Sequence, residues 1–344
     1  MRIKTSEYLT FDDVLLLPNY TNIRSRKDVY ISGMDLNLPV ISSNMDTITG
    51  VDMAITMAKS GGMGVLHRFC SIEENVKALK EVLKHTPNVA VSVGITNGEK
   101  ERAIALIDSG AEIVFIDVAH GAQLAVVEQV RFLREKYKNN IEIIAGNFAT
   151  GESIKHFCLE LNDTKLFPDA FKVGLGPSGV CTTRLKTGVG VPQLYAIIDC
   201  ASAGFPIVAD GGIRHAGDIA KALAAGASAV MIGGMLAGTT ETPGEIIYPE
   251  GEKVCPVKLY KGSASLVSYG EQGKVAEWRT AEGISTTVPL KGSAKEVLSD
   301  IEGGLRSAFT YVGASNLKEF QEKATFIKIS NNTTKENGTY TNEK

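Results

Sequence analysis

The chain has few cysteines, no long apolar run and no excess of one charge sign. Its five cysteines stand far apart without a Cys-x-x-Cys pair, which argues against a zinc site or a disulfide framework. No run of about 18 apolar residues occurs, so no membrane-spanning helix is expected. The net charge of −3 gives no electrostatic case for binding nucleic acid. Residues 1–6 lack the apolar core of a secretory signal, and we expect a cytoplasmic protein.

What the chain does have is a regular alternation of short apolar runs and longer amphipathic stretches. Eight apolar runs predict strands, at 39–42, 63–67, 89–93, 113–117, 141–145, 171–174, 206–209 and 229–232. Helical spacing predicts helices between them, at 51–60, 72–83, 98–109, 124–137, 151–161, 193–203 and 216–225. Strands that alternate with helices form parallel βαβ units, so we predict an α/β fold, a (β/α)8 TIM barrel. A doubly wound sheet is the alternative.

Two segments depart from this rhythm. Residues 239–292 are polar and glycine-rich with weak periodicity, which predicts an irregular, mobile flap after the eighth strand. A helix is predicted again at 297–307, and residues 330–344 have almost nothing apolar, which predicts a disordered tail. The expected organisation is one catalytic domain over residues 1–329.

The active site of a parallel barrel lies at the carboxyl ends of its strands, so the residues that follow each strand are candidates. Two glycine pairs, Gly211-Gly212 and Gly233-Gly234, follow the last two predicted strands. Barrels often bind phosphate there through backbone amides, and the pairs predict a phosphate monoester site rather than simple tight turns. Asp210 precedes the first pair, where it either binds a ribose hydroxyl or braces the turn.

Cys181 ends a loop rich in glycine and serine that follows the sixth predicted strand. Most free cysteines are small buried apolar residues. The polar loop and the neighbours Thr182, Thr183 and Arg184 favour a nucleophilic thiol instead. The carbonyls of the same loop could hold a monovalent cation, whereas no cluster of histidines and carboxylates has the spacing of a transition-metal site.

Four further polar residues lie at the end of a predicted strand or shortly after it. The positions of Asp117 and Asn147 favour contact with a ligand over a structural role in capping a strand end. His67 and His120 are weaker candidates, because a lone histidine more often serves the structure.

Several segments taken together resemble the IMP dehydrogenase / GMP reductase family over roughly residues 7–329. These segments are 9–15, 43–47, 174–184, 188–193, 209–213 and 231–238. The resemblance implies a homotetrameric barrel that binds a purine nucleotide, GMP or IMP. It also implies that a cysteine attacks purine C2.

Three features favour the reductase branch of that family. Residues 71–88 leave room for one helix only, where dehydrogenases usually carry a regulatory CBS pair, and residues 266–272 lack the adjacent Arg–Tyr of the dehydrogenase flap. Residues 275–283, 303–314 and 324–328 resemble the reductase. The resemblance therefore implies reductive deamination of GMP to IMP and ammonia by NADPH. An IMP dehydrogenase and a non-catalytic nucleotide-binding barrel remain the alternatives.

The resemblance also implies a role for individual residues. Cys181 is the nucleophile that forms a thioimidate, and Thr183 and Glu282 relay the proton that ammonia needs to leave. The implied substrate-binding residues are Met45, Ser178, Asp210, Gly211, Gly212, Gly233, Gly234, Gly262, Ser263, Ala264, Arg279 and Gly283. The implied cofactor-binding residues are Ser25, Arg26, Arg68, Asp117, Val118, Ala119, Asn147, Leu175, Gly176 and Ser307. A potassium ion is implied at the carbonyls of Gly176, Ser178 and Cys181.

The chain departs from the family pattern in two places. Ser178 and Gly179 are exchanged relative to the usual Pro-Gly-Ser order before the cysteine, which affects the expected phosphate and cation contacts. The loop 262–264 has serine where the family usually has methionine, which affects the expected contact with the purine base.

Overall fold

The computed structural model of this chain describes residues 7–249, 255–271, 280–330 and 333. Eight parallel strands close into a barrel, which confirms the predicted fold. They are β2 (Val40–Ser42), β3 (Met63–Leu66), β4 (Val89–Val93), β5 (Ile113–Asp117), β6 (Glu142–Phe148), β7 (Ala170–Val173), β8 (Ile207–Asp210) and β9 (Ala229–Ile232). Pairing of β2 with β9 closes the ring.

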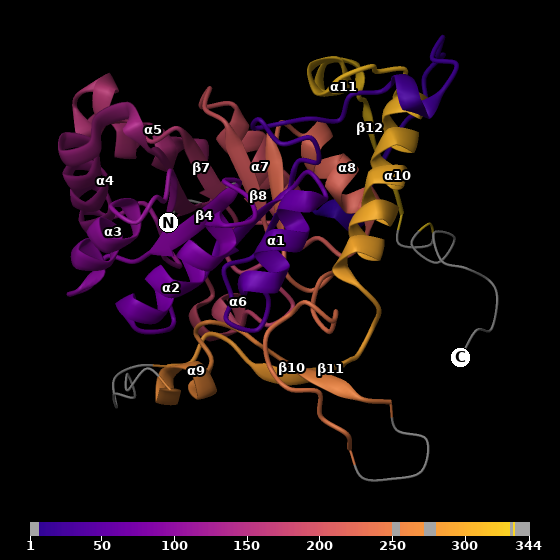
Figure 1. The fold of residues 1–344 in the computed structure, drawn as a ribbon. Coiled ribbons are helices and arrows are strands. Elements are labelled where there is room, and N and C mark those ends of the chain that lie inside the picture. Colours follow the sequence, from indigo (N-terminus) through magenta and orange to yellow (C-terminus); the bar gives the residue numbers. More distant parts are fainter. Residues whose placement is uncertain (1–6, 250–254, 272–279, 331–332, 334–344) are drawn as a thin grey trace.

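The helices between these strands lie where periodicity predicts them and surround the barrel (Figure 1). They are α1 (Val51–Lys59), α2 (Ile72–Leu83), α3 (Glu99–Ile107), α4 (Leu124–Tyr137), α5 (Gly151–Leu161), α7 (Gln193–Ala201) and α8 (Ala216–Ala224). Ser71 begins α2 as a capping box with Glu74, so local sequence fixes the start of that helix.

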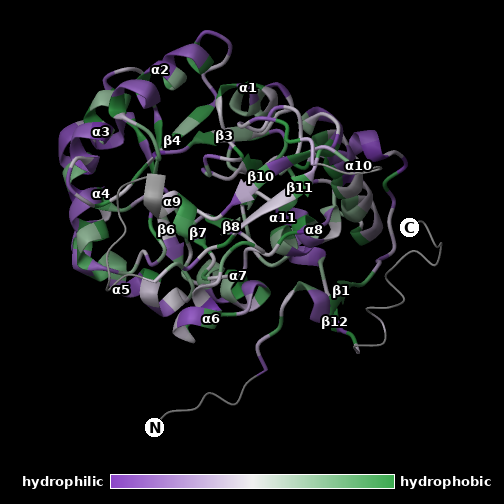
Figure 2. Cartoon of the chain, turned by 90° about the horizontal axis from the view of Figure 1, so that it is seen from below, coloured by the Kyte–Doolittle hydropathy of each residue, from purple (hydrophilic) through white to green (hydrophobic). Residues whose placement is uncertain are grey.

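Apolar side chains fill the barrel and the layer between strands and helices. One cluster inside the ring includes Phe115, Ile144 and Met231. Two larger clusters pack the outer strand faces against the helices. The hydrophobic strands and the hydrophilic outer faces of the helices are visible in Figure 2. Strands buried on both faces explain why their sequences are apolar runs without alternation.

The flap region is more ordered than its composition predicts. Strands β10 (Val257–Lys261) and β11 (Ser285–Pro289) pair antiparallel, from Val257 opposite Pro289 to Lys261 opposite Ser285. This ribbon and helix α9 (Leu266–Glu271) lie at one end of the molecule (Figure 1). The expectation of irregular structure throughout residues 239–292 is therefore wrong for these parts. The ladder of backbone hydrogen bonds needs no strong side-chain periodicity.

Several boundaries also differ from the prediction. Strand β6 runs to Phe148, so Asn147 lies within the strand rather than after it. The helix predicted at 297–307 is α10 (Ala294–Val312), which Ser293 caps and which continues through two glycines. The sequence patterns did not predict α6 (Thr183–Thr187), α11 (Leu317–Lys323) or the antiparallel pair of β1 (Val14–Leu16) and β12 (Phe326–Lys328).

Most of the predicted tail lies outside the described residues. Among the helices that are described, none combines the length and the apolar character needed to cross a membrane.

Candidate active site

A cavity of about 1200 Å³ opens at the carboxyl ends of the barrel strands. Its wall contains most of the residues singled out in the sequence, although they come from seven of the eight strands and from the flap. They are Met45, Arg68, Asp117, Val118, Ala119, Asn147, Leu175, Gly176, Ser178, Cys181, Thr183, Asp210, Gly211, Gly212, Gly233, Gly234, Gly262, Ser263, Ala264, Glu282 and Gly283. Arg279 lies outside the described residues. This volume exceeds the roughly 300–1000 Å³ typical of small-molecule sites, so the cavity has room for more than one small ligand.

Three side chains form a chain of hydrogen-bonding groups at the centre of this wall. The Sγ of Cys181 lies 3.2 Å from the Oγ1 of Thr183. The Thr183 hydroxyl donates to the Oε2 of Glu282 over 2.7 Å. A thiol, a hydroxyl and a carboxyl in this order can pass a proton away from sulfur and back to a leaving group.

Backbone contacts hold Glu282 in this position, far along the chain from the cysteine. The amide of Thr182 donates to the carbonyl of Glu282 over 2.7 Å, and the amide of Glu282 donates to the carbonyl of Ala264 over 3.0 Å. Cys181 and Gly283 also form an antiparallel β-bridge. Three segments are thus joined by main-chain hydrogen bonds, which fixes the geometry more firmly than side-chain packing alone.

The two glycine pairs lie where a phosphate cradle was expected. Gly211 has φ +88°, and an added Cβ would lie 2.9 Å from the ring of Pro177 in the cysteine loop. A Cβ at Gly233 would lie 3.4 Å from the Tyr260 hydroxyl oxygen. Glycine keeps these backbones open to a ligand, since larger residues would fill the space.

Tyr260 is a cavity residue that the sequence patterns did not predict. Burial raises the pKa of Tyr260, while a hydrogen bond with Ser178 acts in the opposite direction. Its strand β10 belongs to the flap, so the flap contributes a hydroxyl close to the glycines that follow β9. The contact between Tyr260 and Gly233 forms because β10 packs back against the barrel, which no sequence pattern predicts.

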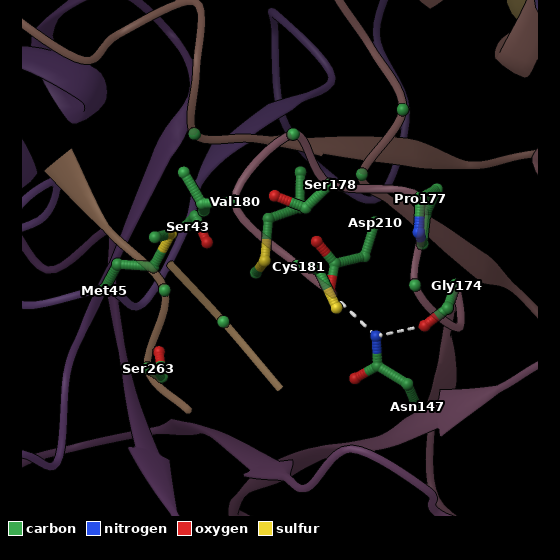
Figure 3. A pocket seen from close by; sticks show the side chains of 18 of the residues that line it. Ser43, Met45, Asn147, Gly174, Pro177, Ser178, Val180, Cys181, Asp210 and Ser263 are labelled. Atoms are coloured by element: carbon green, nitrogen blue, oxygen red, sulfur yellow. Dashed lines mark hydrogen bonds between the residues drawn. The ribbon is translucent and has the colours of Figure 1, made fainter. Parts of the chain in front are cut away.

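The floor of the cavity holds a charged network around Lys172. Its Nζ lies 2.6 Å from Asp117 Oδ1 and 2.6 Å from Asp210 Oδ2. It also donates to the Oδ1 of Asn147 over 2.5 Å. The Asn147 amide donates in turn to Asp210 and to the carbonyl of Gly174, both over 2.8 Å (Figure 3).

The same network sets the pKa values of its members. Burial alone would raise the pKa of Asp117, but the charge of Lys172 and hydrogen bonds from Lys172 and Asn44 lower it below its ordinary value. Burial alone would lower the pKa of Lys172, but the two aspartates raise it. Asp117 therefore stays ionised and Lys172 stays charged at neutral pH.

Two histidine candidates are not brought into the cavity. His67 accepts a hydrogen bond from the amide of Phe69 at its Nδ1, and burial lowers its pKa. The His120 carbonyl accepts from the side chain of Gln123, and neither histidine lines the cavity wall. Both observations favour a structural role for these histidines.

Three of the predicted cofactor residues lie elsewhere. Ser25 caps the short 3-10 helix η2 (Arg26–Asp28), which packs against α10, where Ser307 lies. Arg26 donates to the hydroxyl of Tyr311 over 3.4 Å. These residues gather on one outer patch and do not line the cavity of the same chain.

The cysteine loop carries its own fixed positive charge. Arg184 donates from Nε to the carbonyl of Leu175 over 3.0 Å and from Nη2 to that of Val191 over 2.5 Å. A Cβ added at Gly176 would lie 2.7 Å from the Cγ of this side chain, so the arginine packs beside one of the residues whose carbonyls the resemblance implies for potassium. The carbonyl of Ser178 accepts from the Cys181 amide. In the described part of the chain no cluster of histidines, cysteines and carboxylates could hold a metal ion.

Comparison with known proteins yields related sequences along nearly the whole chain. The model of the IMP dehydrogenase / GMP reductase domain matches residues 8–340. A GMP reductase of Escherichia coli is 41% identical over 350 residues, which cover 96% of this chain and 97% of that protein. GMP reductase 1 of Mus musculus is 38% identical over 348 residues, with the same coverage.

A solved structure agrees with these sequences. The crystal structure of a Trypanosoma brucei GMP reductase variant in complex with guanosine 5'-monophosphate superposes with a TM-score of 0.89. Its sequence is 26% identical, and the match covers 98% of both chains.

Proposed function

The chain belongs to the IMP dehydrogenase / GMP reductase family, and within it we propose that this protein reduces GMP to IMP and ammonia with NADPH. The observation that carries the proposal is the sequence of hydrogen-bonding groups from Cys181 through Thr183 to Glu282. An amino group leaves a purine only as ammonia, so a proton has to reach its nitrogen. A hydroxyl backed by a carboxyl beside the nucleophile supplies that proton.

In the first half of the reaction the sulfur of Cys181 attacks C2 of GMP. The thiol proton passes through Thr183 to Glu282, and returns along the same path to the 2-amino nitrogen. The bond between C2 and nitrogen then breaks and ammonia departs, which leaves a thioimidate between the sulfur and C2. The distances of 3.2 Å from Cys181 Sγ to Thr183 Oγ1 and of 2.7 Å from Thr183 Oγ1 to Glu282 Oε2 are short enough for direct proton transfer.

The second half needs a hydride at C2. NADPH supplies this hydride when it is bound, and the carbon–sulfur bond then breaks to give IMP and the free cysteine. In the proposal, Asp117, Asn147 and Arg68 hold the nicotinamide end, because they line the same cavity on the side of β3, β5 and β6. The patch of Ser25, Arg26 and Ser307 would hold the adenosine end across a subunit contact in a homotetramer. Arginine suits the additional phosphate of NADPH.

The substrate residues divide by chemistry. The phosphate would lie on the glycines that follow β8 and β9, beside Ser178 and Tyr260. Asp210 would accept hydrogen bonds from ribose hydroxyls. The loop 262–264 would bind the base edge through its backbone, because Gly262 and Ala264 are held against the cysteine loop and Glu282.

Potassium has no step in this mechanism. Carbonyl oxygens of the cysteine loop are suitable ligands chemically. Arg184 donates to the carbonyls of Leu175 and Val191, which are not among the three that the resemblance implies for the ion. We predict that potassium, when bound, would be held by the carbonyls of Gly176, Ser178 and Cys181, and that replacing potassium by choline would lower kcat. An unchanged kcat would exclude the ion from this loop.

The function is tested with the purified full-length chain. GMP and NADPH should give loss of nicotinamide absorbance and one ammonia for each cofactor oxidised. IMP and NAD should give no sustained formation of NADH. Sustained oxidation of IMP would assign a dehydrogenase, and GMP binding without turnover in either direction would assign a non-catalytic barrel.

A further inference from the structure

Lys172 is an unusual residue for a barrel strand. It lies in β7 between apolar neighbours, and its side chain is 3% exposed. Buried lysines are rare unless their charge is paired. All three hydrogens of its ammonium have acceptors, in Asp117, Asp210 and Asn147. The lysine has no obvious part in the chemistry at C2.

The three partners of Lys172 belong to different parts of the cavity. Asp210 ends β8 beside the glycine pair and belongs to the nucleotide pocket. Asp117 ends β5, where the proposed function puts the nicotinamide, and Asn147 lies in the next strand. A single ammonium thus contacts both ligand sites.

We propose that Lys172 is a positioning residue that couples binding in the nucleotide pocket to binding at the nicotinamide end of the cavity. The inference rests on the proposed function. A ribose hydroxyl that donates to Asp210 shares the carboxylate whose Oδ2 Lys172 now contacts. The ammonium then interacts more strongly with Asp117 and Asn147 and holds them in place for the second ligand. By linkage, the cofactor strengthens nucleotide binding by the same factor.

A purely structural role is the competing explanation. In that case Lys172 only neutralises two buried carboxylates, and its loss would lower stability without changing how one ligand affects the other. The two explanations differ in the coupling factor, which is the ratio of one ligand's dissociation constants with and without the other. Couplings between sites are typically about 5- to 150-fold.

The experiment measures NADP+ binding by calorimetry with and without saturating GMP. Oxidised cofactor has no hydride to donate, so the second half of the proposed reaction cannot occur in the ternary complex. We expect GMP to tighten NADP+ binding by about tenfold in the unmodified protein, near the low end of typical couplings. The Lys172→Met/Asp117→Asn double variant keeps the net charge of the cluster and should bring the ratio close to one. GMP affinity measured alone should change much less.

Two further variants complete the design. Asp117→Asn alone retains the ammonium and measures how much of the effect belongs to Asp117. Lys172→Arg retains a buried cation and should recover part of the coupling even where Lys172→Met alone fails to fold. A ratio near one in the unmodified protein, or an unchanged ratio in the folded double variant, overturns the proposal. Failure of the unmodified protein to bind GMP would instead count against the proposed function.

Discussion

Removal of the Thr183 hydroxyl should separate the two halves of the proposed reaction. Thr183→Val keeps the shape of the side chain and deletes the hydroxyl that contacts both the Cys181 sulfur and the Glu282 carboxyl. The lost hydrogen bond to a carboxylate is worth about 1.5–3 kcal/mol, or roughly 10- to 150-fold in rate. Loss of general acid catalysis extends the expected decrease in kcat to roughly 10²- to 10⁴-fold.

The assay measures kcat from NADPH absorbance with saturating GMP, and ammonia release in parallel. KM for GMP should change by less than about threefold, because no phosphate or ribose contact is altered. The reverse hydride step from IMP to NADP+ needs no amine. It should therefore still give up to one NADPH per active site in the variant.

Thr187→Val is the matched control. Thr187 lies in the same short helix, and its hydroxyl donates to the Thr183 carbonyl over 2.7 Å without reaching Glu282. The control should retain kcat within about threefold. If Thr183→Val keeps a comparable kcat, the proton reaches the amine by another route, and the assignment of Thr183 and Glu282 is refuted.

Three further outcomes are expected. Cys181→Ala should bind GMP by calorimetry yet give no detectable turnover, and residual turnover would exclude a covalent thioimidate. Burial raises the pKa of Cys200 to about 12, so iodoacetamide at pH 8 should leave Cys200 unmodified in the folded protein. The same reagent should alkylate the free Cys181, and bound GMP should reduce this alkylation, as measured by mass spectrometry. Burial lowers the pKa of His67 below its ordinary 6.5, so below pH 6.5 the unfolded chain binds a proton more readily than the folded protein does. The free energy of unfolding should therefore decrease as the pH falls below 6.5. His67→Gln should reduce this decrease when stability is measured by chemical denaturation.

The sequence predicted the features that leave a strong local pattern. The barrel strands are apolar runs, and the glycine pairs after β8 and β9 stand at fixed places relative to those runs. Cys181 was visible because a polar loop surrounds it. Glu282 was identified only through family resemblance, because its position depends on backbone contacts with residues about one hundred positions away.

Other parts of the site have no such pattern. Lys172 lies inside a run that is typical of an ordinary buried strand. Its charge is explained only when β5, β6 and β8 bring Asp117, Asn147 and Asp210 to it. Tyr260 reaches the glycines that follow β9 because β10 folds back over the barrel. The position of Lys172 depends on closure of the barrel, and that of Tyr260 depends on the packing of the flap against it. Patterns within a single segment of sequence do not predict either.

The pairing of β1 with β12 has a consequence for how the chain folds. Val14 lies opposite Lys328, and Leu16 lies opposite Phe326, so this ribbon joins segments from opposite ends of the polypeptide. Contacts between such distant segments carry a large loop-closure entropy and form after local ones. During synthesis, β1 therefore has to wait for its partner until nearly the whole chain has left the ribosome. The same proximity makes the protein a good substrate for circular permutation, with a short linker across the ribbon and new ends in an exposed loop far from the cavity.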